Sequence, residues 1–384
     1  MAEERRISAD VYDKLSNDCK IMLYNQALLN KGGAFTYRKG DKYILSQSTD
    51  IRFSGSYGVI EQRLLTYDIS VSDCFIGLAV TILGTADLVG IMDVLRWLKE
   101  KYPEKVIPST ITLATLKDRL VKMSRAGIIR HFTIANDDNK RGSLFCTSEL
   151  GARAIKRRLD MDFLSYDTWP LIDCEHRMYK RLIANKIGCA LLPYNKREPA
   201  KFYSEIYDKA KGVRVPIYVR QEIPYKNDGI EKLAYVVVEP VSFNVDSIIK
   251  TESEVEDDVR NKLNAVFTKI DIAKGTQSFG TDTKEKKYDE AFAIIVVDDM
   301  ACLNRVLRII VSGSITNLSK CYFTTEMILS KHKGRFLRSL IKVDAADLSK
   351  VRMNIDMNLQ EIFGEDNLSD IPDSFKEMIF AEGE

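Results

Sequence analysis

The sequence predicts an α+β protein with more than one domain. Residues 71–165 read as three helices, a short hairpin and a final helix, whereas residues 166–335 alternate strands with helices. The charge is also uneven: residues 105–160 hold twelve Lys or Arg and five Asp or Glu, while the whole chain of 384 residues has a net charge of only +2. Basic charge is therefore concentrated in the first region, as it is in proteins that bind a nucleic-acid backbone.

The basic region opens with a predicted helix that begins after Thr112 and ends before Gly127. Thr112 is suited to the N-cap and Gly127 to the C-terminal stop. One face carries apolar residues at helical spacing, and the neighbouring face carries polar residues that can meet a ligand. The apolar residues are Leu113, Leu116, Leu120 and Met123, and the polar residues are Thr112, Thr115, Arg119 and Lys122.

Two short strands are predicted next, over residues 128–134 and 143–147, around a polar loop with Lys140 and Arg141 near its tip. Two further helices are predicted upstream, between residues 71 and 102. A basic helix over residues 149–159, which includes Arg157 and Arg158, follows the strands. Three helices followed by a β-hairpin are the order of a winged helix-turn-helix, with the loop as its wing.

A winged helix of this charge is expected to bind double-stranded DNA. We expect the bases to be read by Thr112, Thr115 and Arg119. We expect the phosphates to be bound by Lys117, Lys122, Lys140, Arg141, Arg157 and Arg158. Winged helices also serve as protein-interaction modules, so a scaffold without DNA binding is the alternative for this region.

The second region, residues 166–335, is expected to be an α/β domain. It contains a hairpin with Asn227, Asp228 and Gly229 at the turn, an acidic helix over residues 253–267, and a buried strand followed by a helix over residues 300–312. Asp298 and Asp299 end that strand, where α/β sites usually form. A metal-dependent nuclease would need an Asp opposite a Glu-x-Lys, and the nearest triplet, residues 285–287, lies in a polar loop. No catalytic residue is therefore assigned, and the chain is expected not to be an enzyme.

No metal or cofactor is expected either. The seven Cys are scattered and the three His lie far apart in sequence, so that only Cys174 and His176 resemble a fragment of a zinc site. No phosphate-binding glycine loop occurs. The chain has no apolar run long enough for a membrane span and starts without a secretory signal, so a cytoplasmic protein is expected. Residues 1–70 suggest no role, and the acidic residues 336–384 read as a docking tail or a solvated terminus.

Four sequence features resemble the replication-relaxation family of plasmids and integrative conjugative elements. They are LVKMSRAGIIR, LFCTSELGARAIKRRL, CEHRMYKRL, and Lys284 with Tyr288 ahead of AFAIIVVDD and CYFTTEMIL. The resemblance implies a winged helix joined to a degenerate restriction-endonuclease-like α/β domain. It also implies a role in plasmid replication control or in the assembly that prepares DNA for conjugation, with a relaxase or a replication initiator as partner.

Two other functions stay open for the whole chain. One is a transcriptional regulator whose α/β domain binds a ligand or forms a homodimer, and the other is a metal-dependent nuclease. The sequence specifies neither the DNA site nor the oligomeric state.

Overall fold

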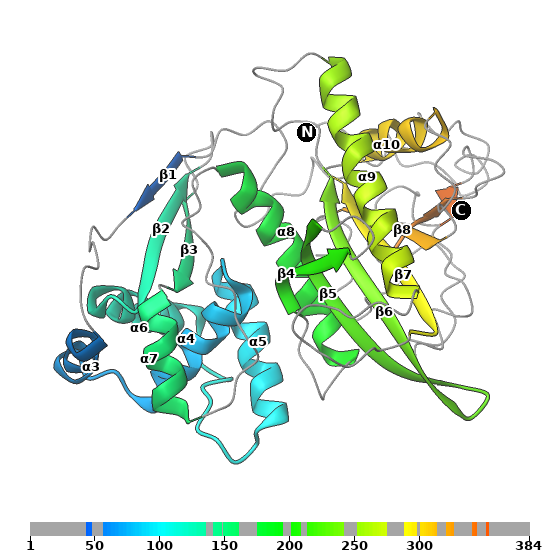
Figure 1. Cartoon of the computed structure of the whole chain (residues 1–384). Coiled ribbons are helices and arrows are strands. Elements are labelled where there is room, and N and C mark those ends of the chain that lie inside the picture. The colour runs from blue at the N-terminus through cyan, green and yellow to red at the C-terminus, as the bar shows by residue number, and fades with distance from the viewer. Residues whose placement is uncertain are drawn as a thin grey trace, which may run out of the picture. The chain divides into compact units, whose positions relative to one another are not determined.

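The computed structural model mixes helices with β-sheets and divides the chain into two compact units (Figure 1). The first unit spans Gly40–Ser204, and the second contains the described residues from Glu205 onward. The structure describes residues 44–47, 57–135, 141–147, 149–160, 175–194, 201–208, 213–241, 252–274, 288–297, 300–312, 320–325, 340–343 and 351–352.

Four helices of the first unit precede its hairpin, and their ends follow from local sequence. They are α3 (Tyr57–Thr66), α4 (Val71–Leu83), α5 (Leu88–Lys101) and α6 (Leu113–Ala126). Ser70 caps α4 in a capping box with Asp73, and Asp87 caps α5 by accepting from the Gly90 N–H. The two predicted ends of α6 are confirmed: Thr112 is its N-cap, and Gly127 ends it at a φ of 81°.

Three strands form the sheet of this unit, with β2 (Ile129–Ala135) in the middle. It pairs antiparallel with β3 (Arg141–Thr147) and with β1 (Ile44–Gln47). The predicted hairpin is confirmed, although β3 begins two residues earlier than expected. On the other edge of β3, Ala86 forms a one-residue bridge with Phe145 between α4 and α5.

The core of the first unit lies where α4 meets α6 and α7 (Glu149–Leu159). Leu116, Leu120 and Met123 of α6 are fully buried as predicted, but Leu113 is 47% exposed because it lies in the first turn, at the edge of the buried face. A Cβ on Gly77 of α4 would lie 2.7 Å from Met123 Cε and 2.5 Å from Ile155 Cδ1. Gly77 therefore allows both neighbours to approach α4 closely.

Helix α8 (Glu175–Leu191) also belongs to the first unit and continues into a short turn of 3₁₀-helix, Leu192–Tyr194. Arg181 donates to the Thr85 hydroxyl at 2.9 Å, and the Asn185 amide donates to the carbonyls of Leu83 and Thr85. These contacts lie between α4 and α5. The sequence predicts this helix within the α/β domain, and that prediction is wrong. The contacts that attach α8 to the first unit involve residues about a hundred positions upstream, which a local pattern does not reveal.

A five-stranded sheet in the order β4-β5-β6-β7-β8 makes up most of the described part of the second unit, and its first strand begins four residues before Glu205. The strands are β4 (Lys201–Asp208), β5 (Val213–Asn227), β6 (Ile230–Val241), β7 (Glu290–Val297) and β8 (Cys321–Thr324). β5 and β6 are antiparallel, and their turn is the predicted one, with Asp228 and Gly229 at positive φ. β6, β7 and β8 run parallel.

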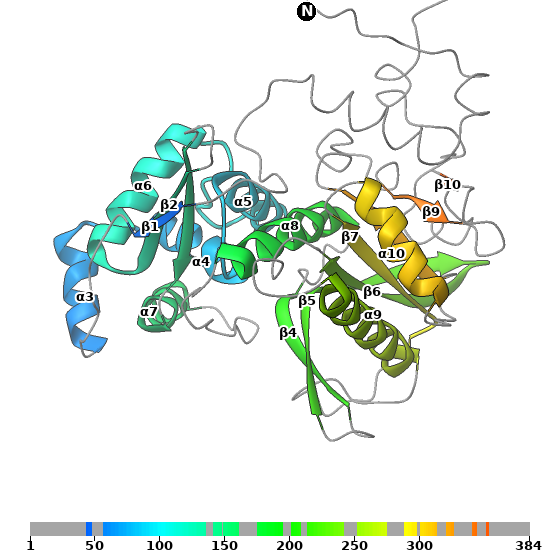
Figure 2. The same cartoon turned by 90° about the horizontal axis from the view of Figure 1, so that it is seen from above.

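Two crossover helices connect the parallel strands, α9 (Glu252–Lys274) and α10 (Met300–Ser312). They lie side by side and both contact β7 (Figure 2). α10 has the predicted bounds, and the acidic helix extends seven residues beyond the predicted end. Two short strands, β9 (Lys342–Val343) and β10 (Val351–Arg352), pair with each other, and Ile341 bridges to Phe323 of β8. Among the described residues, no helix is long and apolar enough to cross a membrane.

Candidate nucleic-acid interface

The outward face of α6 is the centre of the candidate interface. Because successive residues turn by about 100° around a helix, the side opposite the buried Leu116, Leu120 and Met123 is presented to solvent. That side carries the exposed Ala114, Asp118 and Arg125, and the exposed Thr115 and Lys117 lie on its two flanks. Cations on such a helix can bind phosphates, Arg can also bind guanine, and a carboxylate can accept from the amino group of cytosine.

Thr112 and Thr115 were both expected to read bases, and the structure places them together at the start of α6. Both are exposed. The Thr115 N–H donates to the Thr112 hydroxyl at 3.2 Å, and the two hydroxyl oxygens lie 3.0 Å apart. Thr112 therefore stabilises the helix end, and the Thr115 side chain is the one that lies on the outward face.

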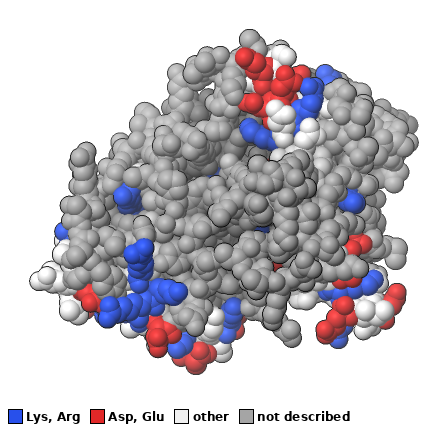
Figure 3. Space-filling view, viewed as in Figure 1, with Lys and Arg blue, Asp and Glu red and all other residues white. Residues whose placement is uncertain are grey.

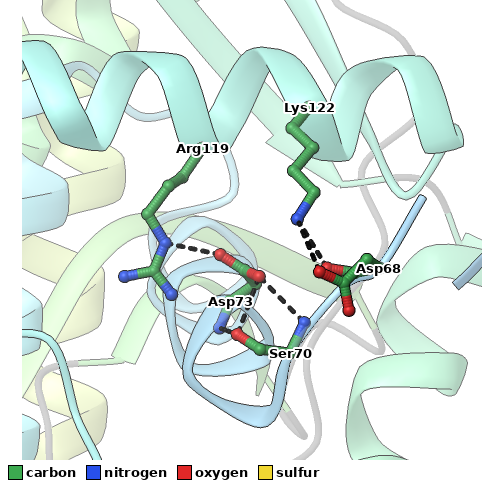
Figure 4. A network of polar contacts seen from close by, with 5 residues as sticks. All are labelled: Asp68, Ser70, Asp73, Arg119 and Lys122. Atoms are coloured by element: carbon green, nitrogen blue, oxygen red, sulfur yellow. Dashed lines mark hydrogen bonds and ion pairs between the residues drawn. The ribbon is translucent and has the colours of Figure 1, made fainter. Parts of the chain in front are cut away.

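Arg119, the third expected base reader, lies on the side of α6 that faces α4 (Figure 4). Its Nε donates to the Asp73 carboxylate at 2.5 Å, and the two side chains are only 22% and 4% exposed. Burial by itself raises the pKa of Asp73, but hydrogen bonds from the Ser70 backbone and hydroxyl and from Arg119 outweigh it, so the net pKa is lowered. The geometry thus gives Arg119 a role in attaching α6 to α4, while its expected contact with a base stays a prediction.

Lys122 makes a parallel contact one turn further along α6 (Figure 4). Its Nζ donates to the backbone carbonyl of Asp68 at 2.5 Å and lies 4.0 Å from the Asp68 carboxylate. Asp68 occupies the turn between α3 and α4 with a φ of 46°, a left-handed conformation that leaves its carbonyl open to this contact. Two of the expected DNA contacts are therefore already engaged within the first unit, Arg119 with Asp73 of α4 and Lys122 with the α3–α4 turn.

The wing is described only at its base. Lys140 and the rest of the loop, residues 136–140, lie outside the described residues. Arg141 is the first residue of β3 and pairs with Ala135 across the hairpin. The expected wing contacts stay predictions.

Helix α7 carries the two remaining expected phosphate contacts, Arg157 and Arg158, both exposed. Arg157 also lies 3.7 Å from Glu61 of α3. α6 and α7 are separate helices that both contact α4 (Figure 2). The structure therefore brings Thr112, Thr115 and Lys117 together on one helix but places Arg157 and Arg158 on a different face.

His131 lies in β2 behind the candidate interface. Its ring stacks on Phe145, with centroids 4.7 Å apart and planes 11° apart. Burial and the nearby Lys117 both lower the pKa of His131. The buried His131 ring is thus part of the core that supports α6.

The second unit contains a separate buried polar cluster on its sheet. The Tyr288 hydroxyl donates to the Glu222 carboxylate at 2.7 Å, and the Tyr288 ring lies 4.9 Å from that of Tyr235. Burial raises the pKa of Tyr288, and Glu222 raises it further; burial also raises the pKa of Tyr235, to about 12, against the opposing effect of Arg220. Tyr288 and Tyr235 are buried and Glu222 is half-buried, so most of this cluster lies inside the second unit.

The described residues contain no group of three or more His, Cys, Asp or Glu that could hold a metal ion. Asp298, Asp299, Lys284, residues 285–287 and Cys174 lie outside the described residues, and so does His176 with respect to its side chain. Burial raises the pKa of the thiols of Cys74 and Cys146 to about 11 and that of Cys321 to about 12, which disfavours the thiolate in each case. Cys74 and Cys321 are buried, and Cys146 is partly exposed.

No protein-family model matches the chain, and no curated protein or solved structure is significantly similar to it. The resemblance to the replication-relaxation family therefore stays a prediction that rests on the motifs quoted above.

Sequence reasoning missed Asp118 and Arg125 on the outward face of α6. A signal for them was present, because both lie opposite Leu116, Leu120 and Met123 on a helical wheel. The inward turn of Arg119 had no comparable local signal, since its partner is 46 residues away.

Proposed function

We propose that residues 71–159 form a winged helix that binds double-stranded DNA, with α6 in the major groove. The support is the element order: a helix, the single bridged residue Ala86, two helices and a β-hairpin whose second strand pairs with that residue. Such a unit uses its third helix, here α6, to enter the groove. The observation that carries the proposal is the exposed part of α6, where Arg125 lies opposite a fully buried face and Thr115 and Lys117 are exposed on its flanks.

In this proposal, Lys117 and Arg125 bind phosphates or base edges, and Thr115 and Asp118 lie where bases would be read. Thr112, Arg119 and Lys122 contribute mainly by fixing the position of α6. The wing residues Lys140 and Arg141 add phosphate contacts.

For the whole chain, we propose a cytoplasmic DNA-binding protein of a mobile genetic element, acting in replication control or in assembly on transferred DNA. The motif resemblance carries this step. In the same reading, the second unit is a nuclease-like α/β scaffold. The nuclease-like fold is supported by the hairpin and the two parallel crossovers that follow it. The scaffold role is supported by the polar cluster of Tyr288, Tyr235 and Glu222, whose side chains contact one another.

The test is a salt titration of binding to a random duplex by fluorescence anisotropy. The double variant Lys117→Ala/Arg125→Ala should lower the slope of log affinity against log salt by about two units, because two cations no longer displace counterions. The matched control is Lys226→Ala/Arg308→Ala, which removes one exposed Lys and one exposed Arg from the second unit. The control should leave the slope unchanged. A wild-type chain that binds no duplex at low salt, or an α6 variant with the wild-type slope, would refute the proposal.

A further inference from the structure

Helix α7 presents a second basic surface, formed by Arg153, Lys156, Arg157 and Arg158. These four are the only exposed residues in the stretch 151–159, so every side chain that α7 offers to solvent there is a cation. Figure 3 shows Lys and Arg gathered over this part of the first unit. Glu61 of α3 and Asp160 lie at its edges. Solvated helix faces usually mix both signs of charge, so this surface calls for an explanation.

Helix stability explains only part of this composition. Cations in the last turn interact favourably with the helix dipole, which accounts for Lys156, Arg157 and Arg158. Arg153 lies earlier in the helix, where it gains little from the dipole. Its spacing to Lys156 and Arg157 is unfavourable for like charges, whereas Glu149, four residues before it, is at a favourable spacing. The helix dipole therefore accounts for three of the four cations, and the exposed stretch as a whole carries a single sign of charge, as a surface that binds a polyanion does.

This surface faces away from the outward face of α6. Ile155 of α7 and Met123 of α6 both point toward Gly77, so α4 lies against the inner side of each helix. On a helical wheel, Arg153 and Arg157 lie opposite Ile155, and Arg125 lies opposite Met123. Met123 and Ile155 reach the same point of α4, so α6 and α7 turn their inner sides toward each other there. Because a helix with its side chains is about 10 to 12 Å across, the two outward surfaces lie roughly 20 Å apart, which is more than the depth of a major groove, about 8.5 Å. A duplex that receives α6 therefore does not reach the α7 surface.

We propose that the α7 surface binds the phosphate backbone of a second DNA segment, so that one molecule bridges two duplexes. The inference rests on the proposed function of α6 and extends it. The exposed side chains of α7 include no Asn, Gln, Ser or Thr, so the second contact is independent of sequence. The first segment would be chosen by α6, and the second would be any nearby duplex.

The experiment is a capture assay with the full chain, in which one duplex is immobilised on beads and a second, labelled duplex is recovered through the protein. Arg153→Ala/Lys156→Ala should keep the affinity for a single short duplex within about twofold and should lower capture of the second duplex at least about tenfold. Arg153→Lys/Lys156→Arg preserves the charges and should capture like the wild type. Lys117→Ala/Arg125→Ala should instead weaken binding of the first duplex. Thermal unfolding of each variant checks that the fold is kept.

Several outcomes would overturn the bridging proposal and leave the proposed function intact. Wild-type protein could bind one duplex and capture no second one. Capture could survive in the α7 variant, which would indicate a dimer with two α6 surfaces. The α7 variant could lose single-duplex affinity to the same extent as the α6 variant, which would indicate one continuous interface. If the wild type binds no duplex at all, the proposed function itself fails, so the two failures are distinguishable.

Discussion

Helices α6 and α7 each carry four Lys or Arg but use them in opposite ways. α6 is attached to its neighbours partly through its own cations, since Arg119 bonds Asp73 and Lys122 bonds the Asp68 carbonyl. α7 is attached mainly by close packing, with Ile155 against Gly77 and Gly151 against the Ile128 backbone, and its four cations are exposed, Arg157 near Glu61 of α3. The number of charges on a helix therefore does not tell how many are available to a ligand; the way the helix is attached does.

The largest effect on the attachment of α7 is expected from a substitution at Gly151. A Cβ at this position would lie 2.1 Å from the backbone oxygen of Ile128, and backbone cannot move aside as a side chain can. Gly151→Ala should lower the free energy of unfolding by about 3 kcal/mol, because it forces α7 away from the chain that follows α6. Urea unfolding followed by Trp fluorescence measures this in the first unit, since both Trp residues, Trp97 and Trp169, fall between residues 40 and 204.

Arg153→Ala is the control on the same helix. It removes an exposed side chain and should change the free energy of unfolding by no more than about 0.5 kcal/mol. If Gly151→Ala changes the free energy of unfolding as little as Arg153→Ala does, close packing does not hold α7 in place and the contrast with α6 is wrong.

At α6, Arg119→Ala should have the next largest effect. It leaves the buried Asp73 carboxylate without its cation and should cost about 2 kcal/mol of unfolding free energy. The comparison is Arg157→Ala, which breaks an exposed pair with Glu61 at 3.7 Å and should cost less than about 0.5 kcal/mol. Equal losses in the two variants would mean that both helices use their cations alike.

The free energy of unfolding measured against pH tests how much the charge of Asp73 contributes. The change should be the smallest of those predicted here, because protonation removes the charge but leaves the side chain in place. The pKa of Asp73 in the folded chain lies below its ordinary value of 3.8. Folding thus favours the charged form, so the contribution is present above pH 3.8 and is lost as the pH falls through the folded pKa. The stability advantage of the wild type over Asp73→Asn should be constant near neutral pH and should narrow below pH 3.8 in urea unfolding. An advantage that does not change with pH would show that the charge of Asp73 contributes nothing.

What the sequence predicted correctly was set by local chemistry. The ends of α6 depend on Thr112 and Gly127 next to the helix, the α10 bounds on a continuous apolar repeat, and the β5–β6 turn on Asp228 and Gly229. Each of these can be read within a few residues of the feature itself.

What it could not predict depends on distant partners. Arg119 looks like a surface cation until Asp73 is placed beside it, and Ala86 gives no strand pattern because its pairing involves one residue. The attachment of α8 to the first unit likewise rests on Thr85 and Leu83, far upstream. These contacts follow from packing rather than from propensity.

The bridge at Ala86 has a mechanical consequence. Its N–H donates to the Phe145 carbonyl at 2.8 Å and its carbonyl accepts from the Phe145 N–H at 2.9 Å, so the peptide between α4 and α5 is clamped to the hairpin on both sides. The hairpin cannot swing relative to α5 unless both hydrogen bonds break, and the fully buried Phe145 ring resists the same movement. A force applied to the hairpin is therefore transmitted to α5 instead of being absorbed by a hinge.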